Sequence, residues 1–205
     1  MSSTDTPKTS FKQRMLQVRE DAIIHAVNRL LAEKGFEAMT VDEVAAQVGI
    51  AKASLYKHFS SKEDLAAAAI VRGMRRAQNF IGGLPSEAPP LENLRAVVRW
   101  LLEVKLAGDM PILPSQSSSL RATLMVNSDY MDSLMAISDR LEKWIEAAQT
   151  RGELSQRLPT IAILFTLFAC ASDPVVEFLQ MGGRFTDEQI TDIVLATYFE
   201  GINAR

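Results

Sequence analysis

The residues best suited to chemistry lie between positions 40 and 59, where the polar side chains suit contact with a nucleic acid. No acidic residue occurs from 51 to 59. A helix that faces only solvent usually mixes charges of both signs, whereas lysine binds phosphate or guanine, serine bonds a base edge, and alanine admits a thymine methyl. The pattern therefore indicates a DNA-binding surface, whose outward positions are Lys52, Ala53, Ser54, Tyr56, Lys57 and His58.

Two short helices must position these side chains. The run Thr40-Val41-Asp42-Glu43 fits a capping box that starts a helix over 41–48, and Gly49 ends it before a second helix over 51–59. This spacing predicts a helix-turn-helix, in which the first helix braces the second and leaves it free to lie in a major groove. A surface helical hairpin without any ligand is the alternative interpretation. The bracing contact is expected from Val44, Ala45, Val48, Ile50 and Leu55.

The segment FEAMTVDEVAAQVGIAKASLYKHFSSKEDL, residues 36–65, resembles the N-terminal domain of the TetR/AcrR family of bacterial transcriptional regulators. The likeness covers about residues 17–65. It is carried by the Thr-x-x-Glu box, by the Val-Gly-Ile turn, and by the run from Ser54 to Leu65.

That resemblance implies a role for each matching residue. Thr40, Tyr56 and Lys62 are expected to contact backbone phosphates, while His58 either packs or contacts phosphate. The positions that face the groove are Lys52, Ala53, Ser54 and Lys57. Ala51 departs from the pattern, because many relatives have Ser or Thr there; the missing cap costs about 1 kcal/mol of helix stability.

Apolar residues at three- and four-residue steps predict helices in nearly every other segment, and no alternating strand pattern occurs. The fold is therefore expected to be all-α, with an N-terminal three-helix helix-turn-helix DNA-binding domain and a C-terminal helical domain. We predict a disordered arm over 1–15, the DNA-binding domain over 16–62, and an effector-binding and dimerisation domain over 63–205. Gly35 is expected to end the first helix, Ser60 and Glu63 to cap the one that follows, and Pro174 to kink or restart the chain after 161–171.

Composition narrows the class of protein further. The 205 residues carry 22 Lys and Arg against 25 Asp and Glu, and residues 1–62 have a net charge of +2 while the remainder has −5. One cysteine, Cys170, excludes an intramolecular disulfide, and His25 and His58 lack a nearby nucleophile and carboxylate, so catalysis is disfavoured. We expect no metal and no cofactor. Because no secretory signal or apolar run of spanning length is evident, we expect a cytoplasmic protein without a membrane partner.

The C-terminal residues carry more apolar surface than one chain needs, which together with the resemblance predicts a homodimer. The expected contact combines 161–171 with Ile190, Ile193, Val194, Tyr198 and Ile202. A small apolar or aromatic effector is expected between the helices that start near residues 91, 115, 129 and 161, because Met adapts to varied shapes and Trp offers a flat apolar wall. Its candidate lining is Trp100, Val104, Met125, Met131, Met135, Trp144, Phe165 and Phe168.

These observations predict a ligand-responsive transcriptional regulator. The resemblance favours a repressor, and a two-fold dimer would bind double-stranded DNA at a palindromic site with half-sites about 34–36 Å apart. The alternative is a helical protein-interaction module that does not read DNA sequence. Salt dependence separates the two, since six to ten phosphate contacts would cost about 10³ to 10⁵ in affinity between 50 and 200 mM salt.

Overall fold

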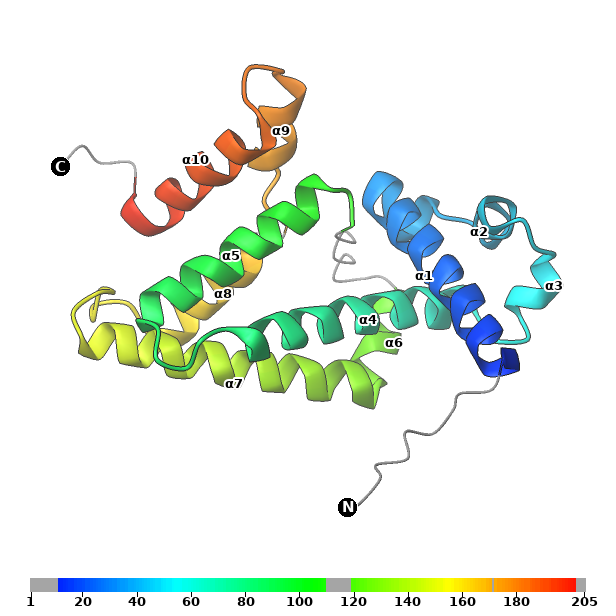
Figure 1. Ribbon diagram of the computed structural model, residues 1–205, viewed down its shortest axis with the longest axis horizontal. Helices are drawn as coiled ribbons and strands as arrows, with labels where there is room; N and C mark the ends of the chain where they lie inside the picture. Colours follow the sequence, from blue (N-terminus) through cyan, green and yellow to red (C-terminus); the bar gives the residue numbers. More distant parts are fainter. Residues whose placement is uncertain (1–10, 110–118, 171, 202–205) are drawn as a thin grey trace, which may run out of the picture.

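The computed structural model describes residues 11–109, 119–170 and 172–201. Within these ranges the secondary structure consists of ten helices and no strand, which confirms the all-α prediction (Figure 1). The helices are α1 Phe11–Ala38, α2 Val41–Val48, α3 Lys52–Leu55, α4 Lys62–Gly83, α5 Pro90–Leu106, α6 Ser119–Val126, α7 Ser128–Thr150, α8 Thr160–Cys170, α9 Val175–Met181 and α10 Asp187–Glu200.

The ends of the first helices follow from local sequence. Gly35 has a φ of 75° and breaks α1 near its end, as predicted. Gly49 adopts the left-handed conformation after α2, which a residue with a side chain rarely does. The cap of α4 is one residue later than predicted: the Ser61 hydroxyl accepts the N–H of Asp64, while the Ser60 hydroxyl donates to the Asp64 carboxylate.

Two apolar cores divide the molecule, and α4 contributes to both. The first core joins α1, α2, α3 and the N-terminal half of α4, and Leu120 and Leu124 of α6 complete it. The second joins α5, α7, α8, α9 and α10 with the C-terminal end of α4, through Ile81. Figure 1 shows α4 and α7 side by side along the length of the molecule, with α1–α3 at one end. A movement of α4 would therefore displace side chains in both cores.

The structure bears on the boundaries predicted at residues 15 and 62. Helix α1 begins at Phe11, so residues 11–15, which were expected in the disordered arm, are helical because the helix starts earlier than the apolar periodicity indicated. Residues 1–10 of that arm lie outside the described residues. Leu65, Ala66 and Ile70 of α4 are buried in the first core, beyond the boundary placed at residue 62.

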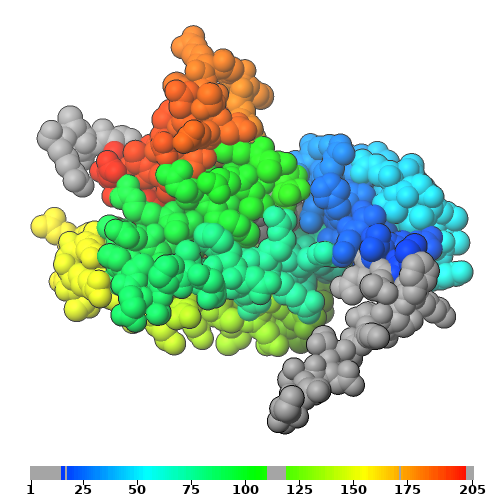
Figure 2. Space-filling model, viewed as in Figure 1, coloured from blue at the N-terminus to red at the C-terminus, as the bar shows by residue number. Residues whose placement is uncertain are grey.

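The C-terminal helices leave many apolar side chains uncovered. Of the fourteen large hydrophobic side chains that are exposed in the described ranges, seven lie between residues 158 and 193: Leu158, Ile161, Phe165, Phe178, Met181, Phe185 and Ile193. Figure 2 shows α9 and the start of α10, in orange, standing out from the body. Within one chain, α8 packs only one face against the second core and leaves its other faces uncovered.

The stretch Thr160–Met181 is long and apolar enough, with a mean hydropathy of 1.7, to meet the length and composition of a membrane span. It consists of two helices, α8 and α9, which are separated by a turn before Pro174. Leu164 and Leu167 of α8 are buried in the second core, where α8 packs against α5 and α7. Ile161, Phe165, Phe178 and Met181 of the same stretch are exposed, so only one side of it packs against the chain.

Asp173 ties the turn between α8 and α9 to two other helices. Its carboxylate accepts the hydroxyl of Tyr198 at 3.0 Å and the N–H of Val175 at 3.0 Å, and its carbonyl accepts the ammonium of Lys105. Burial raises the pKa of the neighbouring Cys170 thiol to about 11. This thiol is therefore protonated at neutral pH and packs as a small apolar group.

Candidate nucleic-acid interface

The predicted brace between the two short helices is present. Val44, Ala45 and Leu55 are buried in the first core, and Val48 and Ile50 pack against it while partly exposed. The turn is fixed by hydrogen bonds that close the end of α2: the N–H of Gly49 donates to Ala46 and the N–H of Ile50 donates to Ala45, at 3.2 and 3.0 Å. These contacts set the direction in which α3 leaves α2.

The second helix of the pair is shorter than predicted. Helix α3 ends at Leu55, and a turn continues to His58, so only part of the expected 51–59 segment is regular helix. Backbone bonds from His58 and Phe59 to the Leu55 carbonyl still hold that turn closed at 2.9 Å. As expected from its sequence, Ala51 provides no side-chain cap for α3.

The side chains predicted to face DNA lie mostly on the outside of this unit. Ser54 and Lys62 are half-buried. The exposed members are Thr40, Lys52, Ala53, Tyr56, Lys57 and His58. Exposure on one side of a braced helix is the arrangement that a groove-reading helix requires, and their contacts with DNA remain a prediction.

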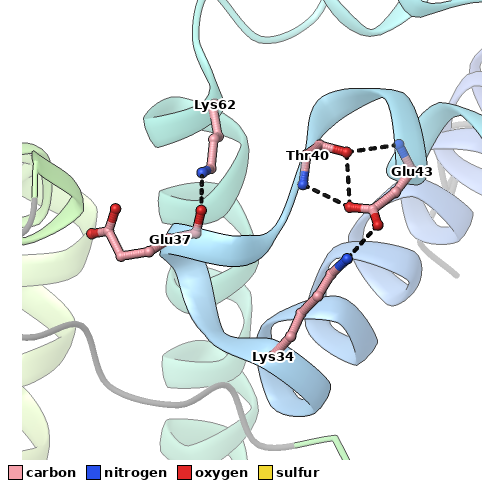
Figure 3. Close-up of polar contacts among 5 residues, drawn as sticks. All are labelled: Lys34, Glu37, Thr40, Glu43 and Lys62. Atoms are coloured by element: carbon pink, nitrogen blue, oxygen red, sulfur yellow. Dashed lines mark hydrogen bonds and ion pairs between the residues drawn. The ribbon is translucent and has the colours of Figure 1, made fainter.

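A polar network fixes the start of α2 (Figure 3). The backbone N–H and the hydroxyl of Thr40 donate to Glu43 Oε2 at 2.9 and 2.8 Å, and the N–H of Glu43 donates back to the Thr40 hydroxyl. The ammonium of Lys34, from α1, ion-pairs with the same carboxylate. The bond from Lys34, followed by those from Thr40, lowers the pKa of Glu43 to about 2. Thr40 therefore caps α2, and its hydroxyl already bonds to Glu43. A contact with a DNA phosphate would have to share that hydroxyl.

Lys62 links the start of α4 to the corner between α1 and α2. Its ammonium donates to the carbonyl of Glu37 at 3.3 Å (Figure 3). The same ammonium lies 4.3 Å from the centre of the Phe36 ring. Cation–π contact and a carbonyl bond both favour the charged ammonium. In this structure Lys62 therefore positions α4 against the helix-turn-helix, in addition to the phosphate contact that the resemblance implies.

An acidic residue that the sequence patterns did not indicate lies against α3. Asp42, in the first turn of α2, accepts the ammonium of Lys52 at 2.8 Å across the turn. This bond raises the pKa of Lys52. The segment 51–59 lacks acids, but the neighbouring helix supplies one. Asp42 precedes Lys52 by ten positions and lies on another helix, so the contact becomes evident only once the turn between α2 and α3 is known.

The groove nearest these residues differs from the predicted effector site. It has a volume of about 760 Å³ and lies between α1, the turn after α3, α4 and the start of α7. Tyr56, Lys57 and His58 line one end of it, and two ion pairs, Arg72 with Asp21 and Arg75 with Asp129, join residues of its wall. It is mainly polar, whereas the predicted effector site was apolar.

The eight candidate effector residues are not all in positions that suit a pocket. Met125, Met135 and Phe165 are exposed on the surface of the chain, because each lies on the outward face of its helix, and their contact with an effector stays a prediction. The other five are half-buried: Trp100, Val104, Met131, Trp144 and Phe168. Trp100 stacks on Phe80 at 5.1 Å, and Trp144 and Phe168 pack against the second core.

Comparison with known proteins places the helix-turn-helix in a family. Residues 23–69 match the model of the bacterial regulatory proteins of the tetR family. The chain is 38% identical over 81 residues to the uncharacterized HTH-type transcriptional regulator YerO of Bacillus subtilis (strain 168), a match covering 38% of this chain and 28% of YerO. The match thus spans less than a third of that relative.

Solved structures resemble the chain over most of its length. FadR from Bacillus subtilis, solved in complex with stearoyl-CoA, has a TM-score of 0.64 and 18% identity, over 89% of this chain and 99% of that one. AibR, solved with isovaleryl coenzyme A and operator DNA, has a TM-score of 0.63 and 22% identity, over 88% and 98%. At these identities the likeness shows the fold, with both its domains. The family match itself is confined to residues 23–69, the segment that holds the helix-turn-helix, and it is to the tetR family of bacterial regulatory proteins.

Proposed function

We propose that the protein is a ligand-responsive repressor that binds a palindromic DNA operator as a homodimer and is released by a small apolar effector. The observation that carries this proposal is the braced helix-turn-helix, with Lys52, Tyr56 and Lys57 exposed on one side within the segment that the family model matches. The exposed residues supply two ammonium groups and a phenol hydroxyl, and such groups bind phosphates and base edges.

A homodimer is supported by the uncovered apolar face of the C-terminal helices. Ile161 and Phe165 are four residues apart on α8 and both exposed, so they share one face of that helix. Ile193 is the exposed apolar residue of α10 among those predicted to make the contact. Ile190 and Val194 are instead buried in the chain's own core, and Ile202 lies outside the described residues. Burying such a face against a second copy removes apolar surface from water.

The effector is proposed from two of the solved structures. FadR was solved with stearoyl-CoA and AibR with isovaleryl coenzyme A, and both ligands join an apolar acyl chain to coenzyme A. An apolar chain suits half-buried residues of α5, α7 and α8, such as Trp100, Trp144 and Phe168. We therefore propose acyl-CoA thioesters as the first class of effector to test. Their binding would release DNA by shifting α4, which joins both cores.

The test is selection of bound duplexes from a random-sequence pool with the purified full chain, at 50 and 200 mM salt. We expect enrichment of an inverted repeat whose half-sites are about 34–36 Å apart, with affinity that falls steeply with salt. Titration of acyl-CoAs of increasing chain length against the selected duplex, with free coenzyme A as the control, is expected to release it. A pool without any enriched sequence at either salt concentration would overturn the DNA-binding proposal.

A further inference from the structure

The start of α3 is held by an ion pair in place of a cap. Ala51 precedes the helix in an extended conformation and contributes no side-chain bond to it. The ammonium of Lys52, the first residue of the helix, reaches back across the turn to Asp42 Oδ2 at 2.8 Å. Their side chains are 47% and 70% exposed, so the pair faces the solvent from which DNA would approach.

Other lysines around the interface are also engaged within the domain. Lys34 ion-pairs with Glu43, and Lys62 donates to the carbonyl of Glu37. Lys52 is the one of these three on α3 itself, and it is the most exposed of the ion-paired lysines of this domain in the described residues. Lys34 and Lys52 thus already have a carboxylate partner within the domain, while Lys62 donates to a neutral carbonyl.

The ion pair between Asp42 and Lys52 reduces the free energy that Lys52 gains on contact with DNA. A phosphate offers Lys52 the same kind of anionic acceptor that Asp42 already provides, so exchanging one for the other brings little net attraction. The exchange also leaves the Asp42 carboxylate unpaired beside a row of phosphates, where like charges repel. A guanine edge is different, because its O6 and N7 acceptors are uncharged and bind lysine only when the helix is in register.

We propose that Asp42 is a specificity-determining positioning residue, which holds Lys52 against α2 so that chance contacts with the DNA backbone gain little. This inference rests on the proposed DNA-binding function. Lys52 is released to the duplex only where the remaining contacts of the site have fixed the helix in the groove. Asp42 thus lowers affinity for DNA in general and raises the ratio of operator to non-operator affinity.

The decisive variant is Asp42→Asn, which removes the charge and keeps the size of the side chain. Fluorescence anisotropy is measured with the selected operator and with a shuffled duplex of equal length and composition, between 50 and 200 mM salt. On the shuffled duplex, we expect about fivefold tighter binding at the lowest salt, the size of one exposed ion pair. The salt slope on that duplex should steepen by about one for each protomer in contact. Operator affinity should rise by less, so that the ratio falls.

Three matched proteins isolate the cause. Asp42→Glu keeps a carboxylate and is expected to retain a ratio close to the wild-type value. Asp192→Asn removes the same charge from an exposed pair with Arg99, between α5 and α10, and should leave the ratio unchanged. In a Lys52→Ala background, Asp42→Asn should no longer alter the ratio, because its proposed effect passes through Lys52.

The outcomes separate this inference from the function on which it depends. If Asp42→Asn changes operator and shuffled affinities by the same factor, or acts equally in the Lys52→Ala background, Asp42 contributes only general charge and the inference is overturned. If the wild-type chain selects no duplex, the proposed function itself fails. Circular dichroism of Asp42→Asn, expected to match the wild-type spectrum, establishes that a changed affinity comes from a folded protein.

Discussion

The N-terminal and C-terminal helices differ in how much of their apolar surface is buried within the chain. In the first core, α1 to α4 and α6 enclose Val44, Leu55 and their neighbours, and the outward side of α3 is polar. In the C-terminal helices, large apolar side chains such as Phe165 and Phe178 remain exposed. The first region is complete within one chain except for Met15, Leu16 and Val18, which are exposed at the start of α1, while the second has an unpartnered face. The polar side of α3 and the exposed apolar side chains of the C-terminal helices therefore lie at separate places in the chain.

The largest effect is expected from placing a charge on the uncovered face. Phe165→Glu, at a side chain 62% exposed in one chain, would bury a carboxylate in the proposed dimer contact and disrupt it. Sedimentation should show a monomer, and operator affinity should fall by about a thousandfold or more, since one helix reads only half of the site. Phe165→Leu is the apolar control.

A Phe165→Glu protein that sediments as the wild type does, with unchanged operator affinity, would show that α8 faces solvent in the working protein. The comparison between a complete and an incomplete region would then be wrong.

The next effect concerns the complete region. Leu55 is 1% exposed, and Leu55→Ala should lower the free energy of unfolding by about 2–5 kcal/mol through reduced burial and the cavity left behind. Urea denaturation measures it. Ala53→Ser, two positions earlier on the exposed side, is expected to stay within about 0.5 kcal/mol of the wild type. A fully stable Leu55→Ala protein would reverse the assignment of inward and outward faces.

A smaller effect is expected from a substitution on the polar side of the α2 and α3 pair. Lys57→Ala should weaken operator binding by about fivefold to tenfold and reduce the salt slope by about 0.9 for each phosphate that the lysine no longer neutralises. Its free energy of unfolding should stay unchanged, because Lys57 is exposed. Binding is read by anisotropy and stability by urea denaturation. Should Lys57→Ala unfold the domain, the residue belongs to the brace and not to the interface.

The smallest effect is the pH dependence of the network at Thr40. The pKa of Glu43, lowered to about 2 from an ordinary 4.5, means that the unfolded chain binds more protons than the folded one between these values. The stabilisation is therefore complete above about pH 4.5 and disappears as the pH falls toward 2. Glu43→Gln keeps a capping side chain without the charge.

Urea midpoints of the two proteins should differ at pH 6 and converge as the pH approaches 2. A constant difference across this range would mean that the Lys34 and Glu43 pair does not contribute to stability.

The fold and the brace were predictable because they depend on local patterns. The capping box at Thr40, the left-handed Gly49 and the burial of Leu55 all follow from residue types within a few positions. Contacts across turns were not predictable in this way. Lys52 meets Asp42 only because the turn folds α3 back beside α2, and periodicity within one helix carries no information about it.

The effector site illustrates the same limit. Met135 and Phe165 satisfied the residue types of a pocket, but which face of α7 or α8 points inward depends on packing between helices. The extent of the first core was also missed, because nothing in residues 120–124 indicates that this helix reaches the N-terminal end of the molecule.

The burial of Leu120 and Leu124 in the first core limits how the N-terminal helices of this chain can be recombined with other proteins. A chimera that joins residues 11–83 to a foreign sensor would lack both leucines and leave an apolar hollow beside α4, at the cost that empty cavities carry. Residues 11–83 therefore cannot be transferred alone as an independent domain, although they are continuous in the sequence. Exchange of parts between relatives is expected to succeed only when the donor supplies its own equivalent of α6.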